Sequence, residues 1–289
     1  MFKNILLPVY NSHATEKIIP YALALAEKNE AIITLITIIE NSATAEAQTS
    51  AENYLRAVAE SLYKKTDGQY KVDWLIGRGE LEKEIARYAE DKQCDLVCLA
   101  SSVKKGLLQH ITGSHSERII RAVNTLVLVV NSAEERRWDQ VFSHLLIPID
   151  NSDDSKKAIN LSKDMAQKLG LRVTLFTMVY HINNTNNTDI VGLSATTDDF
   201  INKENFQEAS SHLKKIAAEM SDIGISVTSK TVIGDDSTTE IAQALDESKA
   251  DLTIMTTRAS SPISAFLMGS NVRKIIDMNC LPILMVKQK

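Results

Sequence analysis

Cysteine and histidine, the side chains that most often bind metals or act as nucleophiles and bases, are few in this chain of 289 residues. Cys94 and Cys98 have a spacing that could bring two metal ligands together. No further cysteine or histidine lies close by in sequence to complete the four ligands of a structural zinc site. We therefore interpret both thiols, and Cys280, as buried structural groups.

Catalytic motifs are also missing from the sequence. It contains no Gly-x-Ser-x-Gly nucleophile elbow, no Walker loop and no zinc-protease helix. The six histidines are scattered, and only His115 lies near a candidate binding loop. It could contact phosphate, act as an acid–base group or simply be a solvated residue in the first turn of a helix. The residues thus predict a binding protein with no catalytic residue and no metal site.

Composition limits the class of protein and its partners. The chain is 44% hydrophobic and 24% charged, which is typical of a globular protein with a core. Its net charge of -5 and its 5% of aromatic residues argue against nucleic acid as the main partner. No apolar run approaches the length that spans a bilayer, and the first residues read as a strand and not as a signal peptide. Three cysteines suit a reducing compartment, so we expect a cytoplasmic protein.

The second half of the chain repeats the first. Residues 4–40 align with residues 144–180 at an offset of 140 without a gap, so that Pro8 falls on Pro148. Repetition over this length indicates two copies of one domain.

Later segments repeat at a larger offset. The segment DLVCLA at 95–100 matches DLTIMT at 251–256, 156 residues further on. We therefore predict a first domain over 1–131, a linker over 132–143 and a second domain over 144–289.

Each copy alternates apolar runs with longer amphipathic stretches. In the strands the apolar residues are consecutive, which is typical of strands covered on both faces of a parallel sheet. The prediction is an α/β fold of two tandem, doubly wound, parallel-sheet domains with five strands each, in which ligands bind beyond the carboxyl ends of the strands. In the first copy we expect strands over about 4–10, 31–39, 70–76, 95–100 and 125–130, and helices over about 13–29, 45–66, 80–92 and 114–123.

These elements carry a family resemblance over essentially the whole chain. The first strand NILLPV, its counterpart HLLIPIDNS and the two tails that begin at Gly113-Ser114 and Gly269-Ser270 resemble the universal stress protein family in its tandem, Rossmann-like form. The resemblance implies a role in stress survival, and in some members ATP binding. It also implies pairing through the last strand of each domain. Here the two copies could pair with each other and form an intramolecular pseudo-dimer, because an apolar edge strand favours pairing.

Nucleotide-binding members resemble the pattern Gly-x2-Gly-x9-Gly-Ser/Thr after the fourth strand. In the first copy Ala100 and Val103 stand at the first two glycine positions, and Tyr10 stands where the family has its ribose-binding aspartate. A branched side chain fits poorly where backbone must approach a phosphate. We therefore expect that the first copy does not bind ATP in the family manner.

The second copy keeps more of the pattern. It retains the aspartate as Asp150, and Met178 matches the family position that contacts adenine, although Thr256 and Ala259 replace the first two glycines. Asp153 and Asp154 follow closely, and they could repel a phosphate or simply complement the helix dipole. The candidate nucleotide-binding residues that the resemblance implies are Pro148, Ile149, Asp150, Met178, Thr256, Thr257, Ala259, Gly269, Ser270 and Asn271, with Gly113, Ser114 and His115 as a lesser set in the first copy.

The sequence thus predicts a cytoplasmic, non-enzymatic, tandem universal stress protein that regulates by binding, with weak AMP or ATP binding in the second domain. Two alternatives stay open. One is an ATP-binding switch with slow hydrolysis, in which Asp150 and Ser270 organise the nucleotide. The other is a scaffold without nucleotide, whose function lies in contacts with protein partners. Association of two chains into a homodimer is a separate hypothesis that the sequence leaves open. The sequence gives no role to the loop expected over 183–199.

Overall fold

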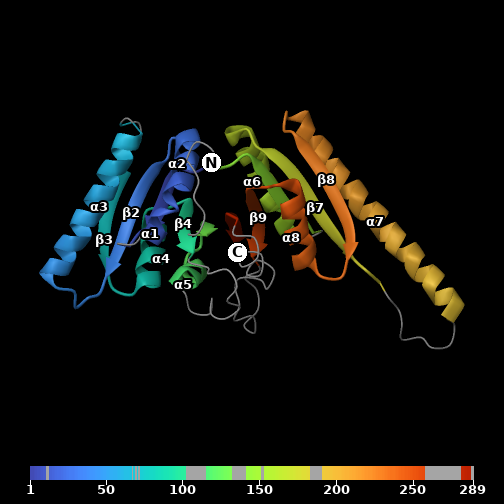
Figure 1. Ribbon diagram of the computed structural model, residues 1–289, viewed down its shortest axis with the longest axis horizontal. Helices are drawn as coiled ribbons and strands as arrows, with labels where there is room; N and C mark the ends of the chain where they lie inside the picture. The colour runs from blue at the N-terminus through green and yellow to red at the C-terminus, as the bar shows by residue number, and fades with distance from the viewer. Residues whose placement is uncertain are drawn as a thin grey trace.

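The computed structural model describes residues 1–10, 13–66, 68, 70, 72–101, 115–131, 141–150, 153–182, 191–257 and 281–287. Strands of both halves stand side by side and form one sheet across the molecule, with α3 near one end and α7 near the other (Figure 1). Among the described residues, no helix is both long enough and apolar enough to cross a bilayer.

The strands of the first copy begin and end within two residues of the predicted positions. They are β1 (Asn4–Pro8), β2 (Ile32–Ile39), β3 (Val72–Arg78), β4 (Leu96–Ser101) and β5 (Leu126–Asn131). The helices between them are α1 (His13–Glu16), α2 (Ile19–Asn29), α3 (Ala45–Lys65), α4 (Leu81–Asp91) and α5 (His115–Ala122).

One predicted helix is wrong in its extent. The structure divides the helix expected over 13–29 into α1 and α2, and Pro20 lies in the first turn of α2. A proline has no amide hydrogen and its ring clashes with the carbonyl four residues earlier, so it starts a helix well but interrupts one.

The second copy follows the same plan with two differences. Its elements are β6 (His144–Pro148), α6 (Asp153–Leu169), β7 (Arg172–Tyr180), α7 (Val191–Asp222), β8 (Val227–Gly234), α8 (Ser237–Ser248), β9 (Leu252–Thr257) and β10 (Ile283–Lys287). Asn160 replaces Pro20, and α6 is a single helix. Helix α7 has 32 residues where α3 has 21, so 191–199, expected to be loop, is helical.

The sheet has ten strands in the order β3-β2-β1-β4-β5-β10-β9-β6-β7-β8. Within each copy the five strands are parallel, as predicted. The two copies join through their last strands, which pair antiparallel with Leu128 opposite Leu284. This confirms the predicted intramolecular pairing, since each copy covers the apolar edge of the other.

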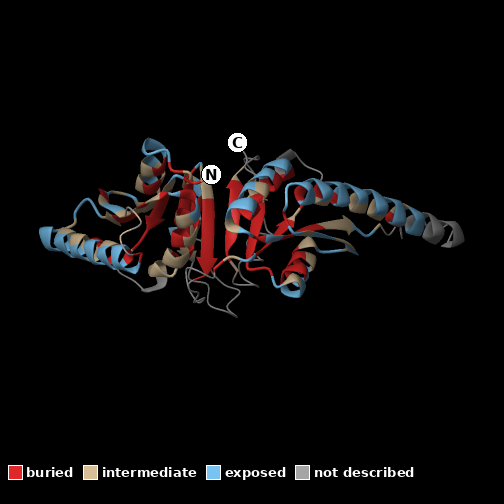
Figure 2. Cartoon of the chain, turned by 90° about the horizontal axis from the view of Figure 1, so that it is seen from above, coloured by how far each residue is buried: buried red, intermediate tan, exposed pale blue. Residues whose placement is uncertain are grey.

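Helices cover both faces of the sheet, as the consecutive apolar residues of the strands predict. On β1 the adjacent residues Leu6 and Leu7 are both fully buried, and they belong to different core clusters. One cluster contains residues of α2, α3, α6 and α7, and the other contains residues of α4, α5 and α8. Buried residues concentrate along the central strands, whereas the outermost helices expose most of their length (Figure 2).

Candidate functional site

The carboxyl ends of the strands converge at one edge of the sheet in each copy, where the candidate residues of the second copy were expected. The backbone amide of Ile149 donates to the carbonyl oxygen of Phe176 at 2.7 Å, and the equivalent Val9 amide donates to Ile36 at 2.9 Å. The two copies therefore present the residue that follows, Asp150 or Tyr10, from the same backbone geometry.

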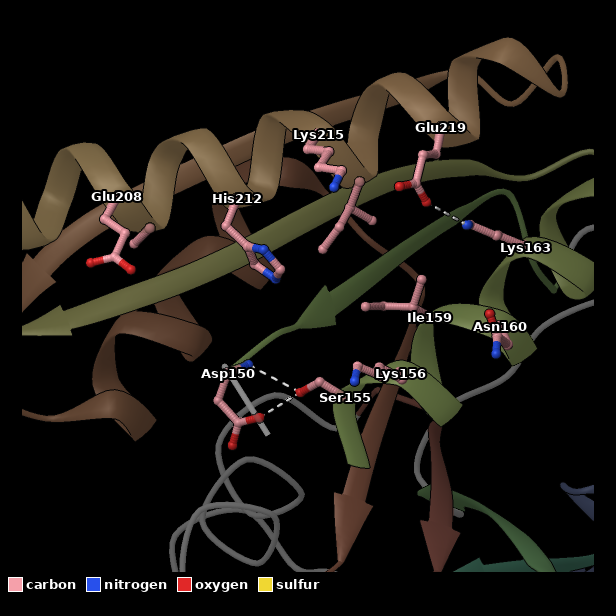
Figure 3. Close-up of a pocket in the computed structure, with 12 residues that line it drawn as sticks. Asp150, Ser155, Lys156, Ile159, Asn160, Lys163, Glu208, His212, Lys215 and Glu219 are labelled. Carbon is pink, nitrogen blue, oxygen red and sulfur yellow. Dashed lines mark hydrogen bonds and ion pairs between the residues drawn. The ribbon is translucent and has the colours of Figure 1, made fainter. Parts of the chain in front are cut away.

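A hydroxyl group organises this turn in each copy. The Ser155 hydroxyl donates to Oδ1 of Asp150 at 2.5 Å and accepts from the amide of Asp150 at 3.1 Å (Figure 3). In the first copy the Thr15 hydroxyl accepts from the Tyr10 amide at 3.1 Å and donates to its carbonyl oxygen at 2.8 Å. The carboxylate of the exposed Asp150 is thus oriented by a buried serine, whereas the two bonds between Thr15 and Tyr10 involve the backbone of Tyr10.

Tyr10 does not project its phenol into solvent. Its Oη atom is buried and has no hydrogen-bond partner among the described residues. Burial raises the pKa of Tyr10, and the negative charge of Glu82 raises it further. The phenol therefore stays neutral and occupies space at the end of β1, where the second copy has a carboxylate.

An ion pair beside Tyr10 was not anticipated from the sequence. Arg118 in α5 donates from Nε to Oε1 of Glu82 in α4 at 3.0 Å. This hydrogen bond is the main reason that the pKa of Glu82 is lowered. The pair joins two helices at positions 36 residues apart, and no local motif marks it.

Three further candidates lie on strands beside the Asp150 turn. Extending the register of β6 with its neighbours places Asp150 level with Met178 in β7 and with Thr257 in β9. Met178 is partly buried against the α8 side of the sheet, and Thr256 precedes Thr257 at the end of β9. The structure therefore brings these candidates to one edge of the second copy.

Of the remaining candidates, Pro148 is the last residue of β6. Gly113, Ser114, Ala259, Gly269, Ser270 and Asn271 lie outside the described residues, as does Val103. His115 is the first residue of α5 and its side chain is exposed.

Cys94 and Cys98 are buried, as the sequence predicts, whereas Cys280 lies outside the described residues. The two buried thiols are free, and burial raises the pKa of Cys94 to about 11 and that of Cys98 further. Both are therefore protonated near neutral pH and are poor metal ligands and nucleophiles. Over the described part of the chain, no group of three or more His, Cys, Asp or Glu side chains could hold a metal ion.

A cavity next to Asp150 was missed by sequence reasoning. It has a volume of about 420 Å³ and lies between α6 and α7, with Asp150 and Ser155 at one end (Figure 3). Its other lining residues come from helix positions that have no motif.

Comparisons with known proteins agree with the repeat and the fold. The model of the universal stress protein family matches residues 1–131 and 142–287. The Methanocaldococcus jannaschii universal stress protein MJ0531 is 29% identical over 161 residues, which are 53% of this chain and 86% of that protein. A second universal stress protein of that organism, MJ0577, is 30% identical over 128 residues, 44% of this chain and 75% of that protein.

A solved structure resembles the tandem arrangement as a whole. The crystal structure of a universal stress protein from Archaeoglobus fulgidus aligns with a TM-score of 0.74, covering 99% of this chain and 96% of that chain at 18% identity. At this identity the likeness concerns the fold alone.

Proposed function

The chain belongs to the universal stress protein family with two tandem copies of its domain, and from this premise we propose that it regulates by binding an adenine nucleotide in its second copy. The first copy has a structural role and does not bind the nucleotide. Stress survival, a cytoplasmic location and contacts with protein partners are parts of the same proposal. Free, buried thiols are compatible with a reducing compartment.

The contrast between Asp150 and Tyr10 carries this proposal. Both follow the first strand of their copy with matching backbone hydrogen bonds, but only Asp150 offers a carboxylate. A carboxylate is the acceptor that the two hydroxyl groups of a ribose require. Ser155 holds that carboxylate in one orientation, which reduces the entropy lost on binding.

Weak affinity follows from the residues after β9. Thr256 and Ala259 replace glycines that would let the backbone approach a phosphate. The base and ribose should therefore contribute more of the binding energy than the phosphates. We expect AMP, ADP and ATP to bind with similar affinities, in the millimolar range that weak sites show.

Binding without turnover is the simplest reading of the chemistry. At this edge the Ser155 hydroxyl donates to the Asp150 carboxylate, and we assign that carboxylate to the ribose and not to a general base. The alternatives differ in their products: a hydrolytic switch releases phosphate, and a scaffold leaves the nucleotide unbound.

Thermal shift and calorimetry with AMP, ADP and ATP test the proposal. Saturable stabilisation by all three should be lost in Asp150→Ala and kept in Asp164→Ala, a matched change at an exposed position further along α6. No stabilisation at millimolar nucleotide would favour the scaffold. Steady phosphate release that Asp150→Ala abolishes would favour the switch.

A further inference from the structure

Each copy has a groove between the two helices that follow its first and second strands. The groove between α2 and α3 has a volume of about 460 Å³, and the groove between α6 and α7 about 420 Å³. Ile19 and Ile159 are equivalent by the repeat and line the two grooves. The fold has therefore built the same groove twice, and only the other side chains differ.

Buried positions align α3 with α7 despite their different lengths. The helices bury Leu55, Val58 and Leu62 in the first copy and Leu213, Ile216 and Met220 in the second, with the same spacing. On this alignment Tyr54 corresponds to His212, Ala57 to Lys215 and Ser61 to Glu219, and all six residues line their grooves.

The first groove is closed by a hydrogen bond between its walls. The Tyr54 hydroxyl donates to Oε1 of Glu16 at 3.1 Å. Ile19, Leu23 and Val58 add apolar surface around this contact. In the first groove a carboxylate and a phenol are thus paired with each other, and Lys65, the last residue of α3, is the one basic side chain among the described lining residues.

The second groove carries basic side chains at the positions where the first groove has a carboxylate and a phenol. Lys156 replaces Glu16, His212 replaces Tyr54, and Lys215 is added from the position of Ala57. The ring of His212 and the ammonium group of Lys215 point from α7 toward α6 (Figure 3). Lys156 and His212 are both basic side chains, so the bond between a carboxylate and a phenol in the first groove has no counterpart of the same chemistry here.

Other charges in this groove are partly compensated. Lys163 is paired with Glu219 at 3.1 Å, and Asp150 is bonded to Ser155. Glu208 lies one turn before His212 on α7 and two turns before Lys215. Its negative charge is therefore nearer to the histidine than to the lysine. Among the residues that the structure describes, neither His212 nor Lys215 has an ion pair or hydrogen bond.

We propose that the α6–α7 groove is a binding site for a small dianion, a phosphomonoester or a dicarboxylate. Lys156, His212 and Lys215 would contact its oxygens, and Ile159 and Ile216 would pack against its carbon skeleton. The volume suits a small metabolite, and Ile159, Ala209 and Ile216 provide apolar surface between the polar groups of the groove. Charge-assisted hydrogen bonds supply the selectivity for an anion.

This site is distinct from the proposed nucleotide site, although Asp150 borders both. Its three basic groups lie on α6 and α7, whereas the nucleotide candidates lie at the ends of β6, β7 and β9. Its test is run without nucleotide, so either proposal can fail alone.

The test follows the imidazole resonances of the full chain by NMR during titration with glycerol 2-phosphate and, separately, with succinate. The His212 resonance, assigned with His212→Gln, should shift saturably with one probe or both, and the response identifies phosphate or carboxylate as the preferred group. His144, buried and hydrogen-bonded to Thr174 at 2.8 Å, should not shift.

Two lysine variants separate a site from general attraction. Lys215→Met should weaken binding at least tenfold, whereas Lys214→Met, an equal change at an adjacent exposed residue that does not line the groove, should leave the affinity unchanged. Equal effects of the two changes, or no saturable shift with either probe, would overturn the proposal.

The first copy provides a gain-of-function test. Combining Glu16→Lys, Tyr54→His and Ala57→Lys gives its groove the basic groups of the second. If these groups form the site, calorimetry should show two bound dianions per chain in place of one. A folded triple variant that still binds one dianion would contradict the proposal.

Discussion

The ammonium group of Lys287 donates a hydrogen bond to the carbonyl oxygen of Val123. Lys287 ends β10 of the second copy, and Val123 follows α5 of the first, so the last described residue of one copy caps a helix of the other. A cation at a helix carboxyl end is favourable, but partial burial lowers the pKa of Lys287 to about 8.

This contact predicts an unusual dependence of stability on pH. The unfolded lysine keeps its proton up to its ordinary pKa of 10.5, whereas the folded one loses it near 8. Between these values the folded state binds fewer protons, so its stability rises with pH. Relative to Lys287→Met, the free energy of unfolding should rise by about 1 kcal/mol from pH 8 to pH 10, after allowing for solvent screening. Urea denaturation at several pH values measures this, and a difference that falls with pH would contradict it.

Tyr10 and Tyr54 should respond oppositely to loss of the hydroxyl. The Oη atom of Tyr10 is buried without a hydrogen-bond partner among described residues, whereas that of Tyr54 donates to Glu16 at 3.1 Å. Tyr10→Phe should raise the free energy of unfolding by about 1 kcal/mol, because an unpaired polar group no longer has to be buried. Tyr54→Phe should lower it by up to about 1 kcal/mol. Urea denaturation of both variants is the measurement, and a destabilising Tyr10→Phe would refute the first expectation.

In each copy the aspartate just before the fourth strand accepts hydrogen bonds from backbone amides at the start of the first strand. The Asp251 carboxylate accepts from the amides of Ser143 at 2.9 Å and His144 at 3.0 Å, and Asp95 accepts from the amide of Lys3 at 2.6 Å. Asp251 is buried and Asp95 is partly exposed. Asp251→Asn should therefore cost about 2 kcal/mol and Asp95→Asn less, as shown by chemical denaturation. Equal costs would mean that burial does not strengthen this contact.

The fold could be predicted from the sequence because its two signals, runs of apolar residues and an internal repeat, can be read without knowing which distant residues are in contact. Consecutive apolar residues such as those of 126–130 mark buried strands, and an ungapped repeat shows that the pattern occurs twice. The break between α1 and α2 was missed, although Pro20 could have revealed it. The helical start of α7 was missed because the first copy has no counterpart of those residues.

The candidate site could be predicted from the sequence only in part. Asp150 and Met178 follow from the repeat and the family resemblance, and the sheet register brings them level. The basic groove was not predicted, because α3 and α7 differ in length and neither repeat offset found in the sequence, 140 or 156, sets His212 over Tyr54. Its charge reversal appears only when buried positions in three dimensions align the two helices.

Pairing of β5 with β10 leads to a prediction about the first copy alone. A fragment of residues 1–131 would expose the edge of β5, where Val127, Leu128 and Val129 pair with the second copy. An apolar edge of this kind pairs with any matching strand, so the fragment should form a symmetric homodimer through β5. Light scattering after size exclusion should give twice the mass of the fragment.

A matched variant identifies the edge as the cause. Val129→Pro removes a backbone donor from β5 and should make the fragment monomeric, because proline cannot complete the ladder. Val72→Pro, placed at the first residue of the outer strand β3, should leave the dimer intact. A monomeric wild-type fragment would mean that the antiparallel contact depends on side chains of β10 and not on a free edge.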